Sequence, residues 1–180
     1  MQIKTKDVVN IGIYVALTLV LDFIKEMIPF LNLPMGGSIN IALIPVVVAS
    51  LHLGIGKGFV VSAFWLVLGT LFGWNGTYLN PMQWSFDYLL PTLVMGFAGI
   101  FYKNRKMFGA IAGIVLTMIL RTLYILISGA YFWFPEGAVA GSSIAWIGSC
   151  QYNLPYSIAT LVVLLVIVPI IISRFKRVRA

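Results

Sequence analysis

The sequence is poor in charge, in cysteine and in histidine, and each shortage excludes a class of protein. Charged residues make up 9% of the 180 positions, whereas an ordinary soluble domain has about 25%. The one cysteine, Cys150, cannot form an intramolecular disulfide, and together with the one histidine, His52, it supplies no cluster of metal ligands. Because 61% of the residues are hydrophobic, the chain is predicted to be an integral membrane protein.

Six apolar runs are separated by short polar or glycine-rich breaks, and together they predict a single membrane domain over residues 1–180. The runs lack the alternation of polar and apolar residues that a transmembrane barrel requires, so only helices fit them. We therefore predict an all-α bundle of six transmembrane helices. The approximate spans are 8–31, 39–53, 59–74, 87–102, 107–129 and 153–173.

Basic residues indicate how the bundle is oriented. Most of them lie in the two tails and in alternate connectors, which the positive-inside rule assigns to the cytoplasm. With six spans, both termini of this multi-pass membrane protein are then predicted to be cytoplasmic. These residues are Lys4, Lys6, Lys57, Lys103, Arg105, Lys106, Arg174, Lys176, Arg177 and Arg179. They form no stripe with interleaved aromatics, so no nucleic-acid partner is predicted in spite of the net charge of +7.

The opposite connectors carry aromatic residues and a single charge, Glu136. An interfacial aromatic belt accounts for some of them. The last connector, over residues 130–152, is predicted to be a long loop, and long loops of this kind are usually functional. The aromatic residues in question are Trp74, Tyr78, Trp84, Tyr131, Trp133, Trp146 and Tyr152. They predict a lid over an outward-facing ligand pocket.

Catalytic motifs are missing. His52 lies beside the inward turn Gly54-Ile-Gly-Lys-Gly58, far from any serine at the outer face, so a Ser/His hydrolase site is not predicted. The same turn lacks the Gly-Lys-Ser/Thr spacing of a phosphate-binding loop. We therefore predict a protein that is not an enzyme and has no cofactor or metal. If ATP drives transport, another chain must supply the ATPase.

Ionisable residues inside the apolar runs are costly, and they usually pair with one another or recognise a ligand. Arg121 lies about 22 Å from the inner end of its span at about 1.5 Å per residue, a depth at which Asp22 or Asp87 could neutralise it. We predict a structural ion pair between Arg121 and Asp22. For Asp87, the neighbouring Tyr88 and the aromatic run before it also favour recognition of a flat, cationic or amine-bearing ligand.

Gly12 and Ala16 place two small side chains on one face of the first span, a pattern that permits close helix approach. They are predicted to form a docking face for a partner helix. The pattern is common in helix bundles, and packing within this chain is the alternative interpretation.

Three separated motifs resemble the substrate-binding S components of energy-coupling factor transporters, most closely the thiamine-specific branch. They are Leu33-Pro-Met-Gly-Gly-Ser-Ile-Asn-Ile-Ala-Leu-Ile-Pro45, Pro81-Met-Gln-Trp-Ser-Phe-Asp-Tyr88, and Arg121 followed by Ile127-Ser-Gly-Ala-Tyr-Phe-Trp133. The resemblance implies a six-helix bundle that encloses a vitamin near its outer surface. It also implies that the Gly12/Ala16 face docks on a transmembrane coupling subunit, which two ATPase subunits drive.

Matching the family's motifs position by position implies that Asp87, Tyr88 and Trp133 bind the substrate, with Trp133 stacking on a ring. We expect further lining residues at Gln83, Trp146, Gln151 and Tyr152.

The chain departs from the family at Ile125, where a histidine is usual, and at Gly148 and Ser149, where a Tyr-Asn pair is usual. Tyr152-Asn153 follows four residues later. The ligand expected is therefore thiamine, a thiamine precursor or another small ring-containing nutrient. A stand-alone secondary transporter that uses Asp22, Asp87 and Arg121 as an ion or proton relay is the alternative function.

Overall fold

Helices make up the regular structure of the computed structural model, which describes residues 4–33, 37–74 and 77–178, without the side chains of 103–106 and 175–178. Outside the described residues lie Pro34 to Gly36, which belong to the first family-like motif, and Arg179. The side chains that are left out include those of Lys103, Arg105, Lys106, Lys176 and Arg177. The elements in order are α1 Thr5–Met27, the 3-10 turn η1 Pro29–Leu31, α2 Leu43–Leu53, α3 Ile55–Leu71, α4 Pro81–Trp84, the π-helix η2 Ser85–Leu89, α5 Leu90–Met95, α6 Tyr102–Phe132 and α7 Ser143–Val178.

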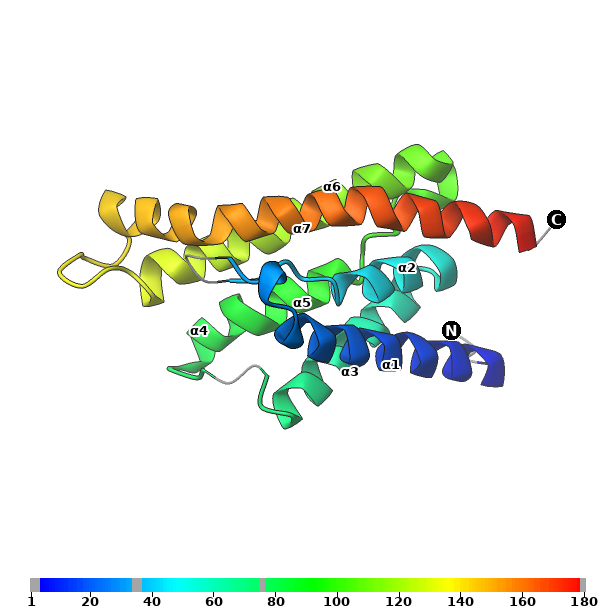
Figure 1. The fold of residues 1–180 in the computed structure, drawn as a ribbon, viewed down its shortest axis with the longest axis horizontal. Helices are drawn as coiled ribbons and strands as arrows, with labels where there is room; N and C mark the ends of the chain where they lie inside the picture. Colours follow the sequence, from blue (N-terminus) through cyan, green and yellow to red (C-terminus); the bar gives the residue numbers. More distant parts are fainter. Residues whose placement is uncertain (1–3, 34–36, 75–76, 179–180) are drawn as a thin grey trace.

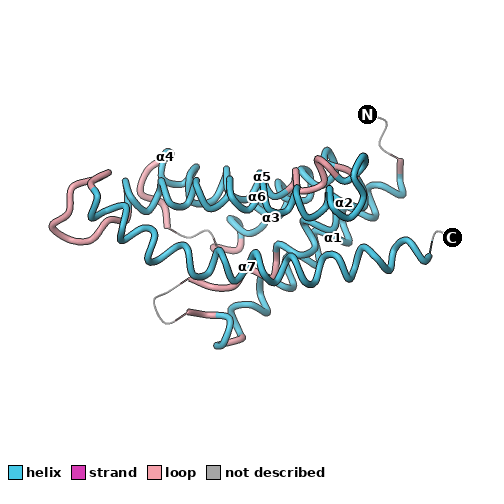
Figure 2. The backbone as a smooth tube through the Cα atoms, turned by 90° about the horizontal axis from the view of Figure 1, so that it is seen from above, coloured by secondary structure: helices cyan, strands magenta, loops and turns pink. Residues whose placement is uncertain are grey.

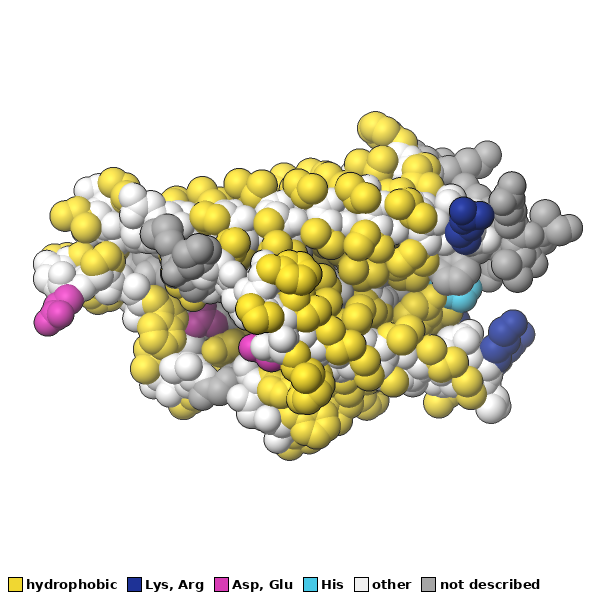
Figure 3. Space-filling model, in the orientation of Figure 1, with side chains coloured by type: hydrophobic (Ala, Val, Ile, Leu, Met, Phe, Trp, Pro, Cys, Tyr) yellow, Lys and Arg dark blue, Asp and Glu magenta, His cyan; other side chains and the backbone are white. Residues whose placement is uncertain are grey.

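Among the residues that the structure describes, three helices are long and apolar enough to cross a membrane, namely those over Thr5–Met27, Met107–Phe132 and Ser143–Arg174. The helices Leu43–Leu53 and Ile55–Leu71 are apolar but shorter. Large hydrophobic side chains are exposed along the long helices, and in Figure 3 they cover most of the visible face between the two ends. This surface is that of a multi-pass membrane protein.

The core forms around α2. Its residues from Leu43 to Leu51 are all buried, as expected of a helix that is hydrophobic on every side. It contacts α1, α3 and α7, and Figure 1 shows it enclosed among them. Gly54, with a φ of 93°, ends α2 and lets the chain turn directly into α3.

Both termini lie at one end of the molecule, while α4 and the connector between α6 and α7 lie at the other (Figures 1 and 2). The Lys and Arg side chains visible in Figure 3 gather at the end with the termini. The long helices α6 and α7 contact each other and run side by side between the two ends. On the face that Figure 3 shows, the two ends of the molecule therefore differ in charge.

The prediction of a long loop over residues 130–152 is wrong. Helix α6 continues to Phe132 and α7 begins at Ser143, so only residues 133–142 connect them. The signal for the early start of α7 is Ser142, whose hydroxyl oxygen accepts a hydrogen bond from the Ala145 N–H at 3.3 Å, as an N-cap serine does. Positive φ angles at Gly137 and Gly141 allow the connector to turn back within this short length.

The predicted fourth span, at 87–102, also begins earlier, because the helical segment starts at Pro81. The side chain of Asn80 accepts the Gln83 N–H at 2.8 Å, and Pro81 occupies the first helical position, where its missing N–H costs nothing. The segment then runs through α4, η2 and α5 to Met95.

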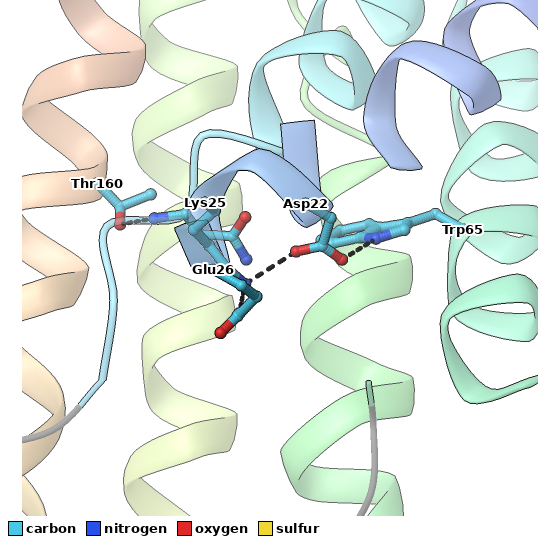
Figure 4. Close-up of polar contacts among 6 residues, drawn as sticks. Asp22, Lys25, Glu26, Trp65 and Thr160 are labelled. Atoms are coloured by element: carbon cyan, nitrogen blue, oxygen red, sulfur yellow. Dashed lines mark hydrogen bonds and ion pairs between the residues drawn. The ribbon is translucent and has the colours of Figure 1, made fainter. Parts of the chain in front are cut away.

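The predicted ion pair between Arg121 and Asp22 is not formed in the described part of the chain. The Asp22 carboxylate accepts hydrogen bonds from the ammonium group of Lys25 and from the indole N–H of Trp65, both at 2.8 Å (Figure 4). Lys25 lies three residues further along α1, where the helix places it within reach of the carboxylate. Asp22 therefore fastens α1 to α3.

Candidate functional site

The helical segment that carries Asp87 changes from α to π geometry between Ser85 and Leu89. The Leu90 N–H donates to the Ser85 carbonyl five residues back. Pro91 has no N–H, so it cannot donate to the Asp87 carbonyl in the usual way. Short π segments of this kind occur frequently at functional sites, and this one sets the directions in which Asp87 and Tyr88 leave the helix.

The two carboxylate oxygens of Asp87 have different surroundings. Oδ2 accepts a hydrogen bond from the indole N–H of Trp133 at 2.8 Å and another from the side-chain amide of Gln83. Within the residues that the structure describes, Oδ1 accepts none. Asp87 lines a cavity, so one oxygen is held by the protein and the other is available to a ligand.

Gln83 holds Asp87 and the preceding loop together. Its side chain is completely buried, and its Oε1 accepts the Leu79 N–H at 2.9 Å. Its Nε2 also donates to the Thr77 carbonyl at 3.3 Å. Both the oxygen and the nitrogen of the Gln83 amide are thus hydrogen-bonded within the protein. Gln83 does not line the cavity, and its role is to hold the Asp87 carboxylate in place.

The cavity has a volume of about 700 Å³, which is within the usual range for a small-molecule site. It is bounded by η2, α6, α7 and the connectors at the end opposite the termini. Its lining residues are Thr77, Asp87, Tyr88, Arg121, Ile125, Gly129, Trp133, Pro135, Gly148, Ser149, Tyr152, Asn153 and Tyr156.

Helix α6 contributes Arg121, Ile125 and Gly129 to the wall, one from each of three successive turns, and Trp133, which directly follows the helix, continues the same spacing. Residues four apart lie on the same face of a helix. This spacing is visible in the sequence and could have identified Arg121 as a lining residue. Sequence reasoning missed it because the charge was assigned to an internal ion pair.

Gly129 allows α6 and α7 to approach closely beneath the cavity. A Cβ atom at this position would lie 2.2 Å from the hydroxyl oxygen of Ser149 and 2.9 Å from its Cβ. The Ser149 hydroxyl also donates to the Leu126 carbonyl at 2.8 Å. This contact fixes the separation of the two helices that form most of the wall.

Polar groups of α7 in the wall largely satisfy one another. Asn153 donates to the Ser149 carbonyl at 2.9 Å and to its hydroxyl at 3.2 Å, and it accepts the hydroxyl proton of Tyr156. Arg121 is held by α5 instead, because its guanidinium donates to the Pro91 carbonyl at 3.0 Å.

The structure brings four of the predicted binding residues together at the cavity, namely Asp87, Tyr88, Trp133 and Tyr152. It does not place Trp146 or Gln151 in the wall. Trp146 packs edge-to-face on Tyr131 with ring centroids 6.3 Å apart. Gln151 is exposed.

Residues 8–180 match the model of a family described as Thiamine transporter protein. The thiamine transporter ThiT of Bacillus subtilis (strain 168) is 26% identical, and the match covers 86% of this chain and 84% of that protein. A solved structure of ThiT from Listeria monocytogenes has a TM-score of 0.75 at 21% identity, and 95% of each chain is covered. At this identity the structural likeness is one of fold.

The role of Gln83 can be tested without a ligand. In Gln83→Leu the Leu79 N–H loses its acceptor, and we expect its hydrogen exchange to quicken by roughly five-fold, in line with a net hydrogen bond of about 1 kcal/mol. Hydrogen exchange followed by mass spectrometry measures this. Gln151→Leu, at an exposed glutamine, should leave the exchange of residues 77–80 unchanged. Equal exchange in both variants would mean that Gln83 does not hold the loop.

Proposed function

Since the chain belongs to the thiamine transporter protein family, we propose that it is the substrate-binding subunit of an energy-coupling factor importer and captures thiamine or a close chemical relative. The observation that carries this proposal is the open oxygen of Asp87 in a cavity beside Trp133. A carboxylate next to an aromatic wall suits a ligand with an amine edge and a flat ring.

In the proposed complex, Asp87 Oδ1 accepts a hydrogen bond from the amine group of the ligand, while Oδ2 keeps its protein donors. Trp133, tied to Asp87 by its indole N–H, covers the ring. Tyr88 and Tyr152 add aromatic surface to the wall. The protein thus presents one pre-oriented charge and several ring faces, and little has to rearrange when the ligand enters.

A binding subunit of this kind is not an enzyme, and it needs partners for uptake. We propose a transmembrane coupling subunit and two ATPase subunits as those partners. Gly12 and Ala16 support a docking face on α1, because both are exposed. A Cβ at Gly12 would have no atom within 4 Å, so no other part of the described chain covers this position.

We further propose that both termini face the cytoplasm and that the cavity opens outward. In this arrangement α1, α2, α3, the segment from Pro81 to Met95, α6 and α7 form the six membrane segments. The positions of the basic residues support the orientation. So does the location of the termini at the end opposite α4 and the 133–142 connector (Figure 1), which carries the cavity residues Thr77 and Trp133.

The alternative of a stand-alone ion-coupled transporter has less support. A relay would require ionisable groups that hand protons or ions to one another. Asp22 is instead engaged by Lys25 and Trp65, and Asp87 by Gln83 and Trp133.

The first prediction from the proposed function concerns binding. Asp87→Asn should weaken thiamine binding by roughly ten- to a hundred-fold, because charge-assisted hydrogen bonds to a desolvated carboxylate contribute about 1.5–3 kcal/mol. Tryptophan fluorescence quenching measures the affinity, and thermal unfolding in detergent reports whether the bundle is intact. Glu136→Gln, at an exposed acid of the 133–142 connector, is the matched control and should bind normally. Unchanged affinity in a folded Asp87→Asn variant would remove the carboxylate from the site.

The second prediction concerns docking. Replacing Gly12 and Ala16 by leucine should abolish ATP-driven uptake by the complete transporter, because bulky side chains prevent close helix approach. Thiamine binding to the isolated subunit should be unchanged. Val162→Phe enlarges an exposed side chain on α7 and should leave uptake intact. A loss of binding in the leucine variant would place this face in the core of the subunit.

The third prediction concerns orientation. In a chain in which Cys150 is replaced by serine, a cysteine at position 104 should be protected from an impermeant thiol reagent added outside intact cells. A cysteine at position 137 should be labelled. The reverse pattern would put the cavity on the cytoplasmic side.

A further inference from the structure

The connector between α6 and α7 is fastened to α6 at both of its ends. At the start, the Trp133 N–H donates to the Gly129 carbonyl at 3.3 Å, and at the far end the Gly141 N–H donates to the Ala130 carbonyl at 2.9 Å. The middle of the connector extends beyond the ends of the two helices (Figures 1 and 2). The part that lines the cavity, at Trp133 and Pro135, therefore belongs to the anchored base of the connector.

Pro135 packs on α7 at Gly148. A Cβ atom at Gly148 would lie 3.1 Å from Cγ and 3.2 Å from Cδ of Pro135, whereas carbon atoms in good contact are about 3.5–4.0 Å apart. The approach is therefore possible because position 148 has no side chain. Both residues line the cavity, so their contact closes the wall where the connector meets α7.

The backbone of α7 does not itself require a glycine at position 148. Gly148 lies in the second turn of the helix, and its φ is not in the left-handed region. Glycine inside a helix is less favourable than alanine, so this position carries a conformational cost. The close approach of Pro135 is the feature of the described structure that explains it.

The place of Pro135 determines the place of Trp133. Trp133 follows the last residue of α6 and has left the helical conformation, with a φ of −126° and a ψ of 28°. Two residues span at most about 7 Å of chain, so a displacement of Pro135 is passed on to Trp133. The indole N–H of Trp133 donates to Oδ2 of Asp87 at 2.8 Å. The contact at Gly148 thus holds this ring beside the carboxylate.

We propose that Gly148 is a positioning residue for thiamine binding, because it seats Pro135 on α7 and so fixes Trp133 beside Asp87. The base of the connector is then a permanent part of the wall. The inference rests on the proposed function and deepens it. The aromatic residues of the connector predict a lid, and a lid has to separate from α7 when a ligand enters. A fixed base instead presents a wall that is already ordered, which lowers the cost of binding.

The first test adds one methyl group. In Gly148→Ala the new Cβ forces Pro135 to move by a few tenths of an ångström, and we expect thiamine affinity to fall by about three- to ten-fold as Trp133 loses its position. Calorimetry on the purified full-length chain measures the affinity. The unfolding temperature without ligand should not fall, because alanine is the better helix former. Ile147→Phe, at the neighbouring exposed position, should bind normally.

The second test removes the atoms that the methyl group meets. Pro135→Ala deletes Cγ and Cδ, and we expect it to weaken thiamine binding because the connector loses its seat on α7. Adding Gly148→Ala to this variant should then change the affinity by less than about two-fold, since nothing is left to displace. Losses that multiply in the double variant would mean that the two residues act separately.

The third test locks the contact with a disulfide, using Pro135→Cys and Gly148→Cys in a chain that carries Cys150→Ser. In a disulfide the Cβ of one cysteine lies about 3 Å from the sulfur of the other, and Cγ of Pro135 is 3.1 Å from the Cβ position of Gly148. We expect the oxidised chain to bind thiamine at least as tightly as the same chain after reduction. A lid predicts the opposite, because the bond prevents it from opening.

Three results would overturn the inference while leaving the proposed function standing. The first is a cysteine pair that does not oxidise, which would contradict the contact itself. The second is an oxidised chain that loses the binding shown by its reduced form, as expected of a lid. The third is a thiamine affinity that neither Gly148→Ala nor Pro135→Ala changes. If the unmodified chain bound no thiamine, the proposed function would fail, and this inference with it.

Discussion

A carboxylate within an apolar bundle has to be supplied with hydrogen-bond donors, and the outer end of this structure depends on how that is done at Asp87. Gln83 supplies one donor from the same helical segment, and Trp133 supplies another from the end of α6. These two bonds join α4, the π-helix and the C-terminal end of α6 at one carboxylate oxygen, and further hydrogen bonds of Gln83 attach the 77–80 loop. Without them Asp87, which is half-buried in the cavity wall, would lose the two donors that orient its carboxylate.

The sequence was sufficient to predict an all-helical membrane protein and four residues that line the cavity. Asp87, Tyr88, Trp133 and Tyr152 were accessible because charge and aromatic surface are unusual in apolar segments. Belonging to the family was likewise predictable from short motifs. The early starts of the segment at Pro81 and of α7 at Ser143 were missed, although Asn80 and Ser142 are good N-caps, because the aromatic residues that follow them were interpreted as a loop.

The wrong assignments have one physical cause. In a helix bundle, the groups that hydrogen-bond to a side chain often come from elements distant in sequence. Nothing near Asp22 in the chain indicates that Trp65 donates to it. Depth alone suggested that Arg121 would meet Asp22, whereas the carbonyl of Pro91 satisfies part of its guanidinium. Likewise, Gln83 looked like a ligand contact, and only the three-dimensional arrangement shows that Leu79, Thr77 and Asp87 use its amide completely.

Helix α2 has a consequence for how the protein enters the membrane. It has 11 residues, a length of about 16 Å at 1.5 Å per residue, whereas the hydrocarbon core is about 30 Å thick. Its residues from Leu43 to Leu51 are buried by neighbouring helices, so these side chains contact protein and not lipid. A helix of this length cannot cross the hydrocarbon core by itself. The direct turn at Gly54 makes α2 and α3 a natural hairpin, and insertion of this pair as one unit against α1 is the order of biogenesis that the packing favours.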